Sequence, residues 1–252
     1  VTEVDLLGLA NVWNLSREND LGERIFGIGN NYGLVNARKA LRREYFNMQD
    51  NLIQKIKAKK QAEVEAKSEW LKKLSRFIVI ANGKTWAADG AEVEPRRPGY
   101  KRLQWPYPDE KMTEQDRKDY EGWEEWRLED EYTGYFRAPG MTTIYHKDKP
   151  VWTMSYGGRG QIEGYEAQAK QTFSFLKSAL MKVTPDLPFR GPKKYSEGNK
   201  TYEFEMIEGD IADGLWKEKI TEDGVLTFKQ TGIVGLVIHR DQNRKPLLPW
   251  KL

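Results

Sequence analysis

The chain contains no cysteine and only two histidines, and these shortages exclude several kinds of site. Without cysteine there is no disulfide framework, thiolate zinc site, iron–sulfur cluster or cysteine nucleophile. With only His146 and His239, a histidine metal cluster is excluded, and a catalytic triad lacks any nucleophile-elbow motif. We therefore expect no metal and no cofactor. A cysteine-free chain suits a reducing cytoplasm, which is the predicted location, with a processed secreted protein as the alternative.

Long apolar runs and a strong excess of one charge are also lacking. The longest apolar run, residues 77–81, is far short of the roughly 18 residues that a membrane-spanning helix needs, so we expect no membrane span. Lys and Arg number 41 against 38 for Asp and Glu, which is not by itself typical of a nucleic-acid-binding protein. The first residue, Val1, leaves a start, a trimmed end and a processing site open.

Two segments share one hairpin pattern. Residues 144–160 place a polar turn at Asp148 before alternating apolar residues and end in glycines, and residues 220–232 repeat this order with a turn at Asp223 and Gly224. Alternation of this kind is typical of strands that bury one face. The sequence therefore predicts an α+β fold with an antiparallel sheet built from two related hairpin units.

Helical patterns precede the strands. We expect an amphipathic helix over residues 2–16, a glycine-rich loop over 21–33 and a long helix, or two helices, over 34–81. Residues 57–69 are rich in Ala, Lys and Glu, as in a solvated connector helix. We therefore predict a helical arm with connector helix over residues 1–68 and an α+β domain over 69–252.

Short strand patterns broken by proline and glycine fill the second part of the chain. The expected strands are residues 84–88, 100–105, 126–136, 142–146, 151–156, 201–207, 215–220, 225–229 and 234–239. A helix over 166–182 should cover one face of the sheet. The acidic segment 106–125 is interpreted as a solvated surface helix or lid.

Several ordered motifs together resemble the family called domain of unknown function 5680. They are the hairpin KPVWTMSYGG at 149–158, the helix FSFLKSAL at 173–180 and the segment LPFRGPKKYSEGNKTYEFEMIEGDI at 187–211. The similarity covers roughly residues 69–238. The resemblance implies a bacterial protein, since the family is largely bacterial and some members look fused to a helix-turn-helix domain. It supplies no catalytic residues.

Our first functional hypothesis is a noncatalytic accessory or regulatory module that binds a protein partner, or a second copy of itself, through its helical arm. An apolar stripe at helical spacing would make this contact. Its members are Leu41, Tyr45, Met48, Leu52 and Ile56.

The second hypothesis is a small-molecule or carbohydrate-binding domain, with or without hydrolytic activity. Its candidates combine aromatic side chains, two arginines and a carboxylate pair that strand alternation places on one face. They are Trp152, Tyr156, Arg159, Arg190, Glu203 and Glu205. Prolines on both sides of Arg190 would hold its guanidinium toward an acidic partner, and we expect Glu208 or Asp210 in that role.

The third hypothesis is a nucleic-acid-binding accessory protein. Basic residues gather on the long helix and near a proline turn, and phosphate contacts require that they share a face. The candidates are Lys57, Lys59, Arg96 and Arg97.

Overall fold

The computed structural model describes residues 31–88 and 90–252 and divides the chain into two compact units, residues 1–63 and 64–252. The predicted helix over 2–16 lies outside the described residues, and so does most of the predicted loop over 21–33. Among the described residues, no helix is long and apolar enough to cross a membrane.

The long helical pattern forms one helix, α3 (Asn31–Asn82). Neither proline nor glycine interrupts residues 34–82, so the backbone hydrogen bonds continue to the end of this segment. Gly83 then follows, and the Thr85 hydroxyl donates to the carbonyl of Ala81 at 2.8 Å, which satisfies a carbonyl of the last turn. The apolar side chains of the last turns, including Leu74, Phe77 and Ile78, are buried in the core of unit 64–252.

A nine-stranded antiparallel sheet forms the body of this unit, in the order β1-β2-β3-β4-β5-β9-β8-β7-β6. Its first five strands are β1 (Glu92–Val93), β2 (Lys101–Trp105), β3 (Trp126–Tyr132), β4 (Gly140–His146) and β5 (Lys149–Gln161). The others are β6 (Lys194–Glu197), β7 (Lys200–Asp210), β8 (Asp213–Glu222) and β9 (Val225–Leu236). The α+β fold with an antiparallel sheet is thus confirmed.

The two related hairpins lie next to each other in this sheet. They are β4–β5 and β8–β9, and β5 pairs with β9. Outward from that pair, β4, β3, β2 and β1 follow on one side and β8, β7 and β6 on the other, so the two hairpins form the middle of the sheet.

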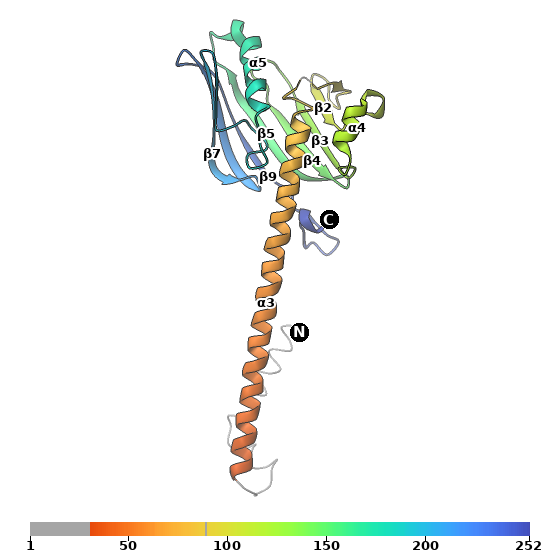
Figure 1. The fold of residues 1–252 in the computed structure, drawn as a ribbon, viewed down its shortest axis with the longest axis vertical. Coiled ribbons are helices and arrows are strands. Elements are labelled where there is room, and N and C mark those ends of the chain that lie inside the picture. Colours follow the sequence, from red (N-terminus) through yellow and green to blue (C-terminus); the bar gives the residue numbers. More distant parts are fainter. Residues whose placement is uncertain (1–30, 89) are drawn as a thin grey trace. The chain divides into compact units, whose positions relative to one another are not determined.

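One face of the sheet carries the core. Side chains alternate along each strand, so residues two apart share a face. Four tryptophans, Trp105, Trp126, Trp152 and Trp216, are at most 1% exposed and lie in this core. The end of α3 and the helix α5 (Ala169–Leu180) cover the face, as the sequence predicted for the second helix (Figure 1).

The acidic segment 106–125 is more tightly integrated than we predicted. It contains a short 3-10 helix, η1 (Asp109–Lys111), and α4 (Glu114–Tyr120), which begins with a capping box between Thr113 and Asp116. The ammonium of Lys84 binds Asp116 at 2.9 Å and Asp119 at 2.6 Å. Tyr120 packs against the core, so this segment is not merely solvated.

Several predicted strands differ from the structure. Residues 84–88 form turns, because Thr85 and the backbone after α3 complete the end of that helix. The predicted strands over 225–229 and 234–239 are one strand, β9, and β5 continues past its predicted end at Tyr156. A short ladder of β10 (His239–Arg240) and β11 (Pro246–Leu247) and the 3-10 helix η3 (Pro249–Lys251) end the chain, and another 3-10 helix, η2 (Glu166–Gln168), precedes α5.

Candidate functional site

A cavity of about 400 Å³ lies within unit 64–252, between the core face of the sheet, α5 and the turn after α3. Aromatic side chains make up much of its lining: Trp86, Tyr132, Tyr135, Tyr156 and Phe173. Four of its polar side chains lie on the sheet and the loop before β6, and we call them the polar floor: Asp130, Tyr156, Arg190 and Gln230. An apolar cavity with a few convergent polar groups is the usual form of a small-molecule site.

The side chains of Asp130 and Tyr156 are in contact because the strand between theirs carries a glycine, Gly140. In the sheet register, Tyr156 of β5 lies opposite Gly140 of β4, and Gly140 lies opposite Tyr132 of β3. A Cβ atom on Gly140 would come within 2.5 Å of the Tyr156 hydroxyl oxygen. Since that atom is missing, the tyrosine ring can lie across β4, and its hydroxyl donates to Asp130 Oδ2 at 2.9 Å.

The carboxyl group of Asp130 is fully buried, and this burial changes its pKa. Its side chain also accepts a hydrogen bond from the Thr142 hydroxyl at 2.6 Å. Burial raises the pKa of Asp130 above its usual value, although the two hydroxyl donors act in the opposite direction. Burial and the nearby carboxyl group also raise the pKa of the Tyr156 phenol well above its usual value.

Arg190 is held by a buried carboxylate. Its Nε donates to Glu218 Oε2 at 3.0 Å, its Nη2 binds the other oxygen, and the Tyr202 hydroxyl donates to Glu218 Oε2 at 2.8 Å. Glu218, on β8, is therefore the partner, and our expectation of Glu208 or Asp210 was wrong. The loop that carries Arg190 is tied to α3 by Asn82, whose Nδ2 donates to the carbonyl of Pro188 at 3.0 Å.

Two residues that line the cavity each carry a fully buried donor with no acceptor among the described residues: the Nε2 of Gln230 and the indole Nε1 of Trp86. Gln230 is only 7% exposed. It lies directly opposite Glu218 in the sheet register, while the Trp86 ring centroid is 5.0 Å from the guanidinium carbon of Arg190. Both donors therefore flank the Arg190–Glu218 pair.

The six predicted ligand-binding residues do not form one cleft. Tyr156 and Arg190 line the cavity. Trp152 is fully buried in the core, where its indole donates to the carbonyl of Ile211 at 2.8 Å. Arg159 is exposed within the β5 bulge between Gly157 and Gly160.

Glu203 and Glu205 point away from the cavity. They alternate with the buried residues Tyr202 and Phe204, so they lie on the other face of the sheet. Glu203 binds Lys219 at 2.8 Å and Glu205 binds Lys217 at 2.9 Å. The Lys219 side chain lowers the pKa of Glu203. An acid and base pair built on these two residues is therefore not part of the cavity.

Sequence reasoning missed four side chains at this site: Trp86, Asp130, Glu218 and Gln230. A signal was present for three of them. Strand alternation places Asp130 on the face of Trp126 and Leu128, and Glu218 on the face of Trp216 and Ile220. Gln230 likewise shares the face of Phe228. A polar residue at an apolar position of a strand is the pattern that would have identified them.

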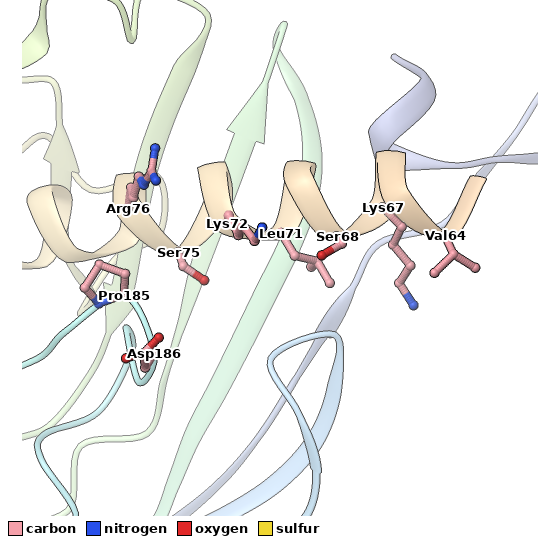
Figure 2. Close-up of a pocket in the computed structure, with 9 residues that line it drawn as sticks. All are labelled: Val64, Lys67, Ser68, Leu71, Lys72, Ser75, Arg76, Pro185 and Asp186. Carbon is pink, nitrogen blue, oxygen red and sulfur yellow. The ribbon is translucent and has the colours of Figure 1, made fainter. Parts of the chain in front are cut away.

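A second hollow runs along α3 within the same unit. Figure 2 shows Val64 and Lys67 at one end and Pro185 with Asp186 at the other, with Leu71 and Ser75 between them. Its volume is about 560 Å³. Most of its side chains are exposed, and among its lining residues only Ser75 is a buried polar one.

The basic candidates are partly engaged with carboxylates. Arg96 binds Glu129 at 2.8 Å, and Arg97 binds Glu131 at 3.0 Å while its guanidinium lies 3.9 Å from the Tyr100 ring centroid. Lys57 and Lys59 are exposed on α3 in unit 1–63. Nucleic-acid binding stays a prediction.

The apolar stripe of the arm belongs to unit 1–63. Leu41 is 67% exposed, Met48 50% and Ile56 59%, while Tyr45 and Leu52 are half-buried. Partner binding through this stripe stays a prediction.

Both histidines lie outside the cavity lining. His146 stacks on Trp126 with ring centroids 4.5 Å apart, and burial lowers its pKa. His239 shares a hydrogen bond of 2.7 Å with the carbonyl of Pro150. Within the described ranges 31–88 and 90–252, no three His, Cys, Asp or Glu side chains are grouped as metal ligands.

Comparison with known proteins supports the resemblance. Residues 130–237 match the family model described as Domain of unknown function (DUF5680). The matched segment runs from Asp130 on β3 to the end of β9 and includes α5, so it contains the whole polar floor and both related hairpins. No curated protein and no solved structure matches the chain.

Proposed function

We propose that unit 64–252 binds a small organic molecule in the cavity above the polar floor. The observation that supports this most is the burial of Asp130, Arg190 and Gln230 beneath an aromatic-lined space of about 400 Å³. Burial of polar groups in a core costs free energy unless they are paired, and Gln230 Nε2 has no acceptor within the described chain. A core with a purely structural role is served better by apolar side chains, so polar side chains gathered at a cavity favour a binding role.

Cavity-blocking substitution tests this proposal. Ala138 lines the cavity from the loop between β3 and β4, so Ala138→Trp should fill the space without disturbing a strand. Prodan, a neutral naphthalene ketone, becomes more fluorescent in apolar surroundings and serves as the probe in a titration of the full chain. We expect saturable binding that Ala138→Trp weakens at least about tenfold, which corresponds to about 1.4 kcal/mol.

The matched control is Ala58→Trp, which adds the same side chain to an exposed position of α3. It should bind the probe like the wild type. Equal affinity of Ala138→Trp and Ala58→Trp would contradict the proposal.

A second function, supported by a separate observation, is protein binding through the arm. The exposure of Leu41, Met48 and Ile56 leaves a row of large apolar side chains in contact with water along one side of α3. We propose that a protein partner or a second copy of the chain covers this row. Together with the cavity, this describes an accessory or regulatory module, and a bacterial origin stays a prediction from the resemblance.

A size measurement tests this second proposal. Sedimentation analysis of the wild type, alone and with candidate partners, should show an assembly that is lost when Leu41, Met48 and Ile56 are replaced by Glu. A control with Glu at Asn47, Asn51 and Gln54, on the other side of the helix, should keep it. A strictly monomeric chain that binds no partner would contradict the proposal.

A further inference from the structure

Three arginine side chains converge on one carboxylate, on the face of the sheet that is turned away from the cavity. Arg127 and Glu129 alternate along β3 with residues of the core such as Leu128, so they lie on the opposite face. We infer that the three arginines, which we call the arginine cluster, bind the doubly charged phosphate group of a phosphate monoester. The cluster consists of Arg96, Arg102 and Arg127.

The carboxylate of Glu129 holds the cluster together. Its Oε1 atom lies 2.8 Å from Arg96 Nη2, 2.9 Å from Arg102 Nη2 and 3.1 Å from Arg127 Nε. Glu129 is buried, with these side chains around it. The three guanidinium groups are therefore neighbours around a single oxygen atom.

Further contacts hold the arginines in place before any ligand binds. Arg102 Nη2 donates to Gln104 Oε1 at 2.9 Å, and its Nη1 donates to the carbonyl of Glu94 at 3.4 Å. The guanidinium carbon of Arg127 lies 4.4 Å from the ring centroid of Tyr145. Side chains that are already ordered lose less conformational entropy when a ligand binds.

The buried carboxylate does not balance the charges of the cluster. Glu129 supplies one negative charge against three guanidinium groups, which stay protonated in proteins. Two positive charges therefore remain close together. A phosphate monoester carries a charge of about −1.5 to −2 at neutral pH, and its oxygens match the planar fork of a guanidinium group. Charge and shape thus both favour a phosphate monoester over a singly charged anion.

Other carboxylates nearby are paired or exposed. Glu131 binds a fourth arginine, Arg97, at 3.0 Å. Asp148 binds Arg127 at 3.1 Å but is exposed, and so is Glu94, so water and salt screen both charges. The other charged side chains of β1 and β2 form a pair of their own at 2.6 Å, Glu92 with Lys101. A phosphate dianion can therefore compete for the guanidinium groups.

Part of the cluster is open to water. The side chain of Arg96 is 52% exposed and that of Arg127 30%. A guanidinium group has five N–H donors, which is more than the protein acceptors that either of these arginines contacts. A phosphate group that approaches from solvent therefore meets donors of both residues.

Two phenyl esters that differ in charge test this inference. Phenyl phosphate is a dianion at about pH 8, whereas the diester methyl phenyl phosphate carries a single charge. Each is titrated into the full chain by isothermal calorimetry at constant ionic strength. We expect saturable binding of the monoester, at least about tenfold tighter than that of the diester, because only the monoester compensates both positive charges.

Arg96→Gln removes one exposed guanidinium group and should weaken the binding of phenyl phosphate about tenfold. Arg117→Gln is the matched control, because Arg117 is 55% exposed and also lies against a carboxylate, that of Asp109 at 3.5 Å. This control should bind phenyl phosphate like the wild type. Equal affinity for the two esters, or equal affinity of the two variants for phenyl phosphate, would overturn the inference.

A single-stranded oligonucleotide, whose phosphates are diesters, is the third titrant. Binding of the oligonucleotide that Arg96→Gln weakens, without binding of phenyl phosphate, would assign the cluster to nucleic acid and overturn the inference. The cavity lies on the other face of the sheet, so none of these results decides whether it binds a ligand.

Discussion

The buried carboxyl group of Asp130 has a different pKa in the folded and the unfolded protein. Burial raises its pKa in the folded state above the unfolded value, so the folded state holds the proton more strongly. The stabilising contribution of this proton is fully present below the unfolded pKa and is lost as the pH rises through the folded pKa.

Asp130→Asn keeps the shape of the side chain and removes the titration. We expect the free energy of unfolding of the wild type to fall relative to that of Asp130→Asn as the pH rises from below the usual aspartate pKa of about 3.9 toward neutrality. Urea unfolding at several pH values measures the difference, and Asp50→Asn, at an exposed position of α3, is the matched control. A difference that grows in favour of the wild type as the pH rises would contradict this prediction.

The Arg190–Glu218 pair is a second prediction at the residue scale. Both side chains are at least 94% buried, since they are 5% and 2% exposed. Removing one partner leaves an uncompensated buried charge, so Arg190→Met should cost about 3–5 kcal/mol of stability. The double variant Arg190→Met with Glu218→Gln should be less destabilised than the sum of the single variants. Denaturant unfolding gives all the values, and simple additivity would show that the pair is not coupled.

Residue-scale reasoning from the sequence selected Tyr156 and Arg190, which line the cavity, but it assigned the wrong carboxylate partner to Arg190. Ligand binding by these two residues stays a prediction. The aromatic and arginine types are informative by themselves. Glu203 and Glu205 show the limit, because alternation correctly places both on one face but does not say which face is covered. That choice depends on where α5 and the end of α3 pack.

Glycines decide how the strands end and bend. Gly157, Gly158 and Gly160 in β5 have φ values of 121°, 73° and 149°, which side chains rarely adopt. They suggested the end of a strand, but the structure uses them for a bulge through which pairing with β9 continues. Gly232 also remains inside β9, because a side chain there would collide with the ring of Trp216. Sequence periodicity identifies the strands, while such local close approaches set their lengths.

Gly140 on β4 provides the prediction at the element scale. Gly140→Ala would place a methyl group 2.5 Å from the Tyr156 hydroxyl and 2.7 Å from Tyr132 Cβ. We expect a loss of about 1–3 kcal/mol in stability, because the tyrosine must move away from Asp130. Thermal or denaturant unfolding measures this loss.

Gly235→Ala is the matched control on β9. The nearest atom to its new methyl group is the carbonyl oxygen of Ala212 at 3.6 Å, an ordinary contact. It should change stability far less than Gly140→Ala. An equal loss from both substitutions would show that the loss does not come from displacement of Tyr156.

At the scale of the whole molecule, the duplicated hairpins predicted the sheet well. The adjacent hairpins β4–β5 and β8–β9 correspond to the repeated pattern at 144–160 and 220–232. The cavity could not be predicted from the sequence, because it depends on how α5, the turn after α3 and the loop that carries Arg190 pack together. The proposed function therefore rests on the cavity and on the buried polar side chains that line it.

The most direct test of a ligand site in unit 64–252 is a crystal structure of the full chain with naphthyl methyl ketone bound. Our account predicts electron density for the ketone inside the cavity, with its rings against the aromatic side chains that line it. Density for the ketone elsewhere on the protein, with the cavity filled by protein side chains, would contradict it.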